Sequence, residues 1–142
     1  MASFVKFQPF VENLAEKVFN LGSDTLKLVL TNTAPVNTQS VLDLVTNHPP
    51  PAATNGYTAG GNTITISTSA QASGTYKLVL ADSVFTASGG NLGPFRYPIL
   101  YDDTAASDQL IAYWDYGSSI TLADGETFTF DCDASTGVLT LA

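Results

Sequence analysis

The apolar residues near the start of the chain recur at intervals of three and four. This spacing places them on one stripe of a helix, and the stripe comprises Phe7, Phe10, Val11, Leu14, Val18 and Leu21. Pro9 suits the first turn of a helix and Gly22 suits its end. The pattern therefore predicts a helix over about residues 8–21, packed on the core or on a partner.

After Gly22 the hydrophobic period changes to two, which is typical of half-buried strands. The segments with this period are 25–31, 63–68, 75–81, 95–101, 109–116, 119–123, 126–132 and 137–142, with a short addition at 84–86. Asp124-Gly125 signals a two-residue hairpin turn, and residues 133–137 suggest a longer hairpin loop. This spacing of strands predicts a mainly β fold, an antiparallel β-sandwich or barrel with one N-terminal α-helix, formed by residues 1–142 as a single domain.

The strand at 95–101 includes the only arginine of the chain. Alternation places Phe95, Tyr97, Ile99 and Tyr101 on one face and Arg96 on the other. Pro98 indicates an edge strand or a bulge, because proline has no backbone N–H to donate. For Arg96 we favour an ion pair with an acid of the same chain over a salt bridge to a partner protein.

Residues 32–62 do not follow either period and are rich in proline and glycine. A connection of this length in a compact domain is normally functional or disordered. The consecutive Pro49, Pro50 and Pro51 favour a stiff, extended conformation. We therefore expect this segment, called the arm below, to contact another protein.

Charge is scarce and unevenly distributed. Only 13% of the residues are charged, against about 25% in an average protein, which suits a subunit that functions in an assembly. The net charge is −8, and residues 97–142 carry eight acids and no base. Such a surface repels phosphate and argues against nucleic-acid binding, although these acids could equally serve solubility alone.

The single cysteine excludes an intramolecular disulfide, and we expect Cys132 to be a buried apolar thiol. The first residues lack a continuous apolar core and include Glu12 and Glu16, so we expect no secretory signal. No stretch reaches the roughly 18 apolar residues of a membrane span. We therefore expect a soluble, unprocessed protein.

Candidate catalytic and metal-binding residues are few. His48 is the only histidine, and its setting in "NHPPP" favours a loop over a nucleophilic triad. Acids that could form a glycosidase pair or a calcium loop are Asp115 with Glu126, Asp131 with Asp133 and Ser135, and Asp102 with Asp103 and Asp108. Strand ends, turns and solvated loops explain these acids more simply. We predict no enzyme activity, cofactor or metal.

Aromatic residues gather on the strand at 109–116. If Trp114 and Tyr116 face the core beside Leu110, alternation turns Tyr113 and Asp115 outward. An exposed tyrosine beside an acid could stack on a sugar, or it could lie in a protein interface, where tyrosine is enriched.

Three stretches carry a resemblance to a known family. They are "FVKFQPFVENLAEKVFNLGSDTLKLVLTNTAP" (4–35), "NGYTAGGNTITISTSAQASGTYKLVL" (55–80), and the run from "GPFRYPILYDD" at 93 to the end of the chain. The chain resembles small structural proteins of tailed bacteriophages, which are similar to capsid decoration or cement proteins with a jelly-roll fold. The resemblance implies a virion protein that is made in the host cytoplasm and binds the outer capsid surface. It implies no catalytic residue.

On this interpretation the partners are the major capsid protein and further copies of the chain, as a dimer or trimer, with no nucleic acid or membrane. The expected contact residues are Phe4, Phe7, His48, Pro49, Pro50, Pro51, Tyr57, Arg96 and Tyr113. Two alternatives are a carbohydrate-binding module of a head or tail fibre and a tail or neck structural subunit. The first predicts an exposed aromatic platform, and the second predicts rings or tubes.

Overall fold

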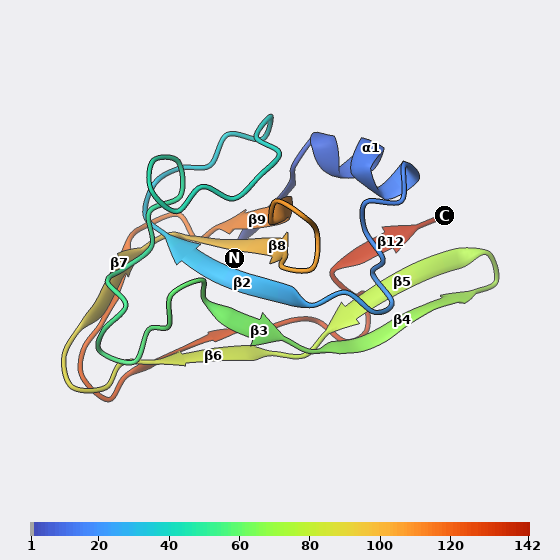
Figure 1. The fold of residues 1–142 in the computed structure, drawn as a ribbon. Coiled ribbons are helices and arrows are strands. Elements are labelled where there is room, and N and C mark those ends of the chain that lie inside the picture. Colours follow the sequence, from blue (N-terminus) through green and yellow to red (C-terminus); the bar gives the residue numbers. More distant parts are fainter. Residues whose placement is uncertain (1) are drawn as a thin grey trace.

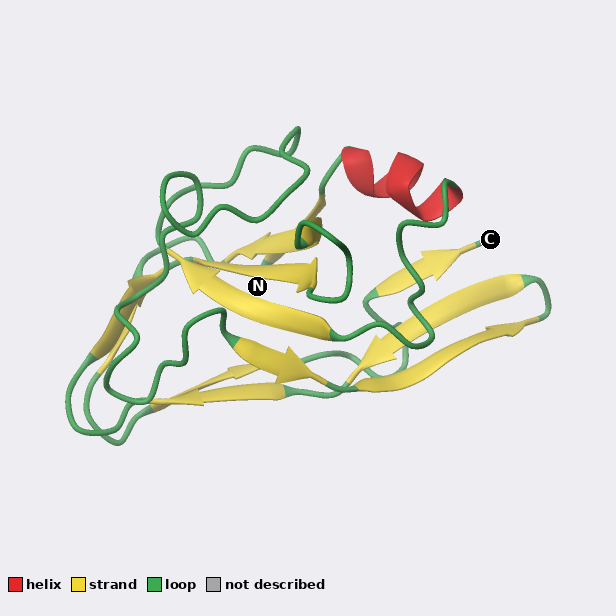
Figure 2. Cartoon of the chain, viewed as in Figure 1, coloured by secondary structure: helices red, strands yellow, loops and turns green. Residues whose placement is uncertain are grey.

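A computed structural model describes residues 2–142 as two layers of antiparallel strands (Figure 1). The first layer is a five-stranded sheet with the order β1-β9-β8-β2-β3. Its strands are β1 (Ser3–Lys6), β9 (Gln109–Asp115), β8 (Tyr97–Asp102), β2 (Leu26–Thr31) and β3 (Asn62–Ile64). The helix α1 (Pro9–Ala15) lies beside this layer, with the first part of the arm on the same side, and the later part of the arm runs around the end of the sandwich to β3 (Figure 2).

The second layer is divided into three small sheets. They are β12-β5-β4, β11-β6 and β10-β7, formed by β4 (Ile66–Ala72), β5 (Thr75–Leu80), β6 (Ser83–Thr86), β7 (Leu92–Phe95), β10 (Ile120–Leu122), β11 (Thr127–Phe130) and β12 (Leu139–Leu141). The structure confirms the mainly β sandwich with one helix. Two predicted strands are each divided, 63–68 between β3 and β4 and 95–101 between β7 and β8.

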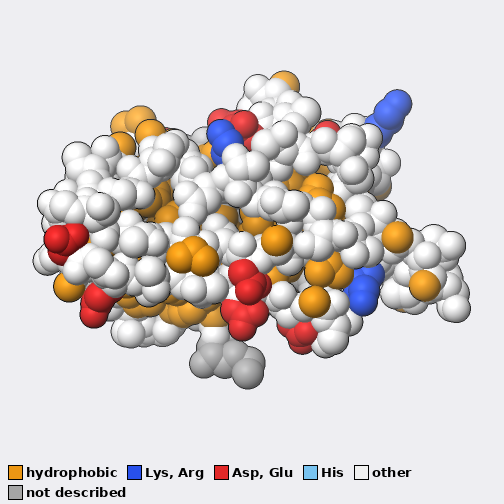
Figure 3. Space-filling view, turned by 90° about the horizontal axis from the view of Figure 1, so that it is seen from below, with side chains coloured by type: hydrophobic (Ala, Val, Ile, Leu, Met, Phe, Trp, Pro, Cys, Tyr) orange, Lys and Arg blue, Asp and Glu red, His pale blue; other side chains and the backbone are white. Residues whose placement is uncertain are grey.

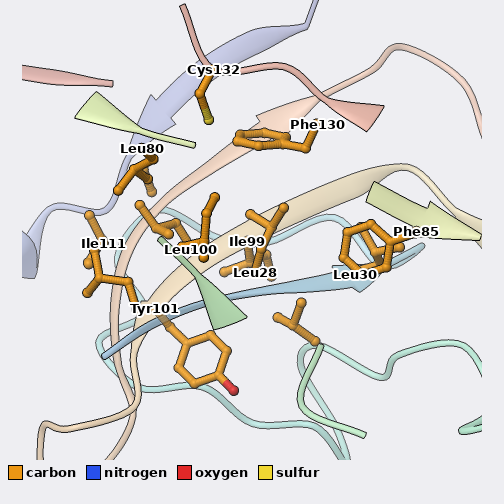
Figure 4. Packing of buried hydrophobic residues seen from close by; sticks show 14 of the residues in the cluster. Leu28, Leu30, Leu80, Phe85, Ile99, Leu100, Tyr101, Ile111, Phe130 and Cys132 are labelled. Atoms are coloured by element: carbon orange, nitrogen blue, oxygen red, sulfur yellow. The ribbon is translucent and has the colours of Figure 1, made fainter. Parts of the chain in front are cut away.

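The core lies between the two layers (Figure 4). Leu28 and Leu30 of β2 and Leu100 of β8 share one face of the sheet, are fully buried and lie toward side chains of the second layer, including Leu80 and Phe130. Every residue of β8 is buried, because the arm and α1 cover the face that the second layer does not. A strand with a continuous buried run is central to its sheet.

The central place of β8 excludes the edge that Pro98 suggested and leaves the alternative of a bulge, since the register of β8 with β9 shifts between Leu100 and Tyr101. Pro98 pairs with Leu30 of β2, and the backbone N–H of Leu30 points away from β8 and donates to the hydroxyl of Tyr57. Backbone groups alternate along an antiparallel pair, so the nitrogen of Pro98 faces β9. The β8–β9 pairing begins only at Ile99, so the missing N–H interrupts no described pairing.

The helix is shorter than the predicted segment 8–21. The N–H of Phe7 donates to the carbonyl of Ile111, which extends the strand pairing of β1 to Phe7 and delays the helix until Pro9. The helix ends at Ala15, and Lys17 adopts a positive φ of 67°. Of the predicted apolar stripe, Phe7, Phe10 and Leu21 are buried, but Val11 is 53% exposed. Phe19, which lies outside the stripe, is buried and packs on Phe10 at 5.3 Å between ring centroids, so the apolar spacing identified only part of the buried set.

Two predicted hairpins are turns between different sheets. The backbone N–H of Glu126 donates to the carbonyl of Ala123 around Asp124-Gly125, but β10 pairs with β7 and β11 pairs with β6. The turn at 133–137 likewise leads from β11 to β12, which pairs with β5. Both turns form as local chemistry predicts, and the packing of the two layers then separates the strands that they join.

Candidate protein-interaction surface

The arm does not extend from the sandwich but is hydrogen-bonded to the five-stranded sheet. The hydroxyl of Thr31 donates to the carbonyl of Pro49 (2.8 Å), and the hydroxyl of Tyr101 donates to the carbonyl of Gly60 (2.8 Å). A side chain at Gly61 would place its Cβ 1.9 Å from the carbonyl oxygen of Leu28. Only glycine permits this close approach, so the arm is fixed against β2 along its later part.

His48 organises the middle of the arm from a fully buried position. Its Nδ1 accepts a hydrogen bond from the backbone N–H of Asp43 (3.1 Å), so the neutral ring carries its proton on Nε2, which donates to the side-chain oxygen of Gln39 (3.0 Å). Burial lowers the pKa of His48, and the nearby Asp43 carboxylate opposes this effect. The neutral ring of His48 therefore links residue 48 of the arm to Asp43 and to Gln39.

Around this link the arm presents apolar side chains to solvent. Val36, Val41 and Val45 are 55%, 40% and 88% exposed, and Val11 of α1 is 53% exposed. We call these four valines the arm–helix face. The arm and α1 are joined where the N–H of Gln8 donates to the carbonyl of Asn37 (2.8 Å), and Figure 2 shows them on one side of the molecule.

The backbone beneath this face is held in place by the sheet. Val41 forms a β-bridge with Gln109, Leu42 donates to the carbonyl of Asp108 (2.9 Å), and Leu110 donates to the carbonyl of Ser40 (3.0 Å). The carboxylate of Asp43 accepts hydrogen bonds from the N–H groups of Val45 and Thr46, which lowers its pKa. The three arm valines are therefore presented to solvent by a backbone that is held in place, with Val41 anchored directly on the sheet.

Several predicted contact residues are structural instead. Phe7, His48 and Tyr57 are buried within the chain, as is Pro51, so their side chains are not available to a partner in this conformation. Pro49 and Pro50 are half-buried. The side chains of the arm residues are buried because the arm folds back on the five-stranded sheet instead of extending into solvent.

Phe4 is the predicted contact residue that the structure leaves most accessible, at 45% exposure. Its ring packs against Trp114 at 5.4 Å. It lies on β1, an edge strand of the five-stranded sheet.

Arg96 forms the favoured ion pair within the chain. Its guanidinium donates to both carboxylate oxygens of Asp115, at 2.7 and 2.9 Å, and lies 5.2 Å from the ring centroid of Tyr97. The pairing lowers the pKa of Asp115 and raises that of Arg96. Arg96 and Asp115 therefore neutralise each other within the chain, which confirms the predicted intramolecular ion pair of Arg96.

Tyr113 is half-buried and does not form a free platform. Its ring lies 5.1 Å from that of Phe7 and 6.4 Å from that of Tyr97. Trp114 packs on Phe130 at 4.7 Å. The aromatic cluster therefore joins β1, β8, β9 and β11 and leaves no flat exposed ring on which a sugar could stack at Tyr113.

The acids proposed as ligands have local partners. The carboxylate of Asp133 accepts hydrogen bonds from Ser135 and Thr136, which lower its pKa to about 2. Burial raises the pKa of the Cys132 thiol to about 12. Within residues 2–142 no group of three or more histidine, cysteine, aspartate or glutamate side chains is placed to hold a metal ion.

Asp102 is a buried acid whose environment the sequence did not reveal. One carboxylate oxygen accepts hydrogen bonds from the N–H groups of Thr104 (2.8 Å) and Ala105 (3.1 Å), and the other is buried with no hydrogen-bond partner. Burial and the adjacent Asp24 raise the pKa of Asp102 to about 6. Near this acid, a groove of about 490 Å³ separates the end of α1 from β5 and β12, with Leu14, Tyr76 and Leu141 in its walls.

Comparison with protein families, curated proteins and solved structures finds no match for this chain. None of the helices described over residues 2–142 has the length and apolar character that crossing a membrane requires. The arm–helix face is therefore the feature from which a function can be argued. Its three arm valines, Val36, Val41 and Val45, follow no period, so isolated β-branched residues in a polar segment were the available signal, whereas Val11 was predicted to lie on the buried stripe of the helix and is exposed instead.

Proposed function

We propose that this protein is a bacteriophage virion structural protein that decorates the outer capsid surface and contacts the shell through the arm–helix face. The phage and capsid assignments rest on the resemblance of the sequence. The observation that carries the binding mode is the set of four exposed valines, with the arm backbone tied at residues 40–42 to Asp108, Gln109 and Leu110 at the start of β9.

A pre-ordered apolar face suits this role. A surface that is already ordered avoids the entropy cost of fixing a flexible arm when it binds. Each valine contributes in proportion to the apolar area that it loses to the partner, at roughly 25 cal/mol per Å². A single contact of this size is weak, but many copies on one closed shell stabilise it together.

The distribution of charge supports the same orientation. The eight acids of residues 97–142 give the chain most of its negative charge, and they suit a protein outside the shell, away from packaged DNA. The arm–helix face is apolar at its four valines, and its acidic neighbours in the sequence are Glu12, beside Val11, and Asp43, between Val41 and Val45. Contact at the valines would therefore remove apolar surface from water.

Co-sedimentation with capsids that lack the protein tests this proposal. We expect saturable binding and a higher temperature for heat-induced DNA release. Val36→Glu and Val45→Glu should each weaken binding, because they place a charge in the contact. Val84→Glu is the matched control, since Val84 is 51% exposed but lies on β6 in the opposite layer.

Absence of binding to mature capsids would refute the decoration role. Rings or tubes formed by the purified protein would then assign it to a tail or neck structure. Equal loss of binding in all three valine variants would refute the arm–helix face as the contact while leaving the decoration role in place.

A further inference from the structure

The β4–β5 hairpin carries the longest edge strand of the described sheets. β4 is one edge of the sheet β12-β5-β4, and its seven residues pair only with β5. The other edges of the two larger sheets are β1, with four residues including Lys6, and β3 and β12, with three each. The hairpin extends beyond the body of the molecule (Figure 1), and its end projects at the right edge of the view in Figure 3 as well.

β4 has almost none of the features by which proteins prevent strands from pairing at an edge. Its sequence, ISTSAQA, contains no charged residue and no proline, and most of its side chains are exposed. A bulge occurs between Ile66 and Thr68, at its first residues only. A long, exposed and uncharged edge is a template for pairing with another strand.

The turn of the hairpin determines which backbone groups are free. Ser73 and Gly74 both have positive φ, 51° and 83°, which is the conformation of a two-residue turn of type I′. Such a turn joins Ala72 and Thr75 as a hydrogen-bonded pair. By alternation, the N–H and C=O groups of Ser69 and Gln71 point away from β5, toward the open edge.

We propose that two copies of this chain pair antiparallel through β4, forming one continuous sheet with the order β12-β5-β4-β4-β5-β12. A two-fold axis at Ser69 places its free backbone groups opposite those of the second copy. In this register Thr68 of one copy faces Ala70 of the other, and Ile66 faces Ala72. All of these side chains are uncharged.

The charge distribution permits a second copy as the partner. Each chain has a net charge of −8, so two copies repel each other least where the contact lies away from their acids. Residues 66–80 contain no acid, and their one charged residue is Lys77. Like charges that face each other destabilise a strand pair, so an uncharged edge is what self-pairing requires. This inference does not depend on the capsid role, because β4 and the arm–helix face are different surfaces.

Sedimentation velocity over a dilution series tests the proposal with the full chain. We expect the wild type to form a dimer that dissociates on dilution. The double variant Thr68→Lys/Ala70→Lys places lysines opposite lysines at two positions and should weaken the dimer by about tenfold or more. The matched variant Thr68→Glu/Ala70→Lys changes the same positions but places opposite charges face to face, so it should remain a dimer.

Hydrogen exchange provides a test without substitutions. The amide hydrogens of Ser69 and Gln71 should exchange slowly when the protein is concentrated and rapidly after dilution. A wild type that is monomeric at every concentration overturns the proposal, as does a dimer in which both double variants behave alike. If the wild type is a monomer and Thr68→Lys/Ala70→Lys loses capsid binding, β4 pairs with the shell instead, which overturns the dimer but not the decoration role.

Discussion

Replacement of Asp102 by asparagine should stabilise the protein at neutral pH and leave its stability unchanged in acid. The carboxyl group is fully buried and one of its oxygens has no hydrogen-bond partner. Asparagine keeps the oxygen that accepts from Thr104 and Ala105, and its NH₂ group replaces the buried anionic oxygen with a donor toward Asp24. The substitution therefore removes a buried charge with little change of shape.

The magnitude follows from the pKa of Asp102, which burial raises from 3.8 to about 6. Between about pH 4 and pH 6 the folded protein holds a proton that the unfolded chain has released, so the free energy of unfolding falls as the pH rises through this window. Above pH 6 the loss is complete and amounts to about 3 kcal/mol. Asp102→Asn should therefore match the wild type near pH 4 and exceed it by up to about 3 kcal/mol above pH 7.

Urea unfolding of both proteins at a series of pH values measures this difference. Glu16→Gln is the control, because Glu16 is exposed on the turn after α1 and its replacement removes one negative charge from the same highly acidic chain. A difference between Asp102→Asn and the wild type that is constant from pH 4 to pH 8, or a variant that is less stable at pH 7, would show that the buried charge does not destabilise the fold.

Three further predictions concern buried polar groups. Tyr57→Phe removes the acceptor of the buried Leu30 N–H and should cost about 1–3 kcal/mol in urea unfolding, whereas Tyr116→Phe, whose hydroxyl makes no hydrogen bond described within residues 2–142, should cost less. In an NMR pH series, the pKa of His48 should lie below its ordinary value of 6.5. Its contribution to the free energy of unfolding should be lost as the pH falls below 6.5, because the unfolded chain then binds the proton more tightly than the folded protein. A midpoint at or above 6.5 would contradict the burial of His48 as a neutral ring. Cys132 should resist a thiol reagent in the native protein and react after unfolding, because its thiol is buried with a pKa near 12; equal rates in both states would contradict its burial.

The sequence alone determined the features that depend on neighbouring residues. The period of two located the strands, because alternation decides which side chains a strand can bury. The turn chemistry of Asp124-Gly125 and of residues 133–137 located two turns correctly. Cys132 was placed in the core, and Arg96 was paired within the chain, since a lone arginine among many acids readily finds a carboxylate.

Tertiary structure decided everything that depends on which distant segments meet. α1 ends at Ala15 although its apolar spacing continues, and the two turns connect different sheets rather than hairpins. The arm appeared free because its anchors, Thr31 and Tyr101, lie in other strands. The pKa of Asp102 depends on Asp24, 78 positions earlier in the chain. Local patterns specify the conformation of a segment, but burial and pairing are set by contacts between segments, which no local pattern records.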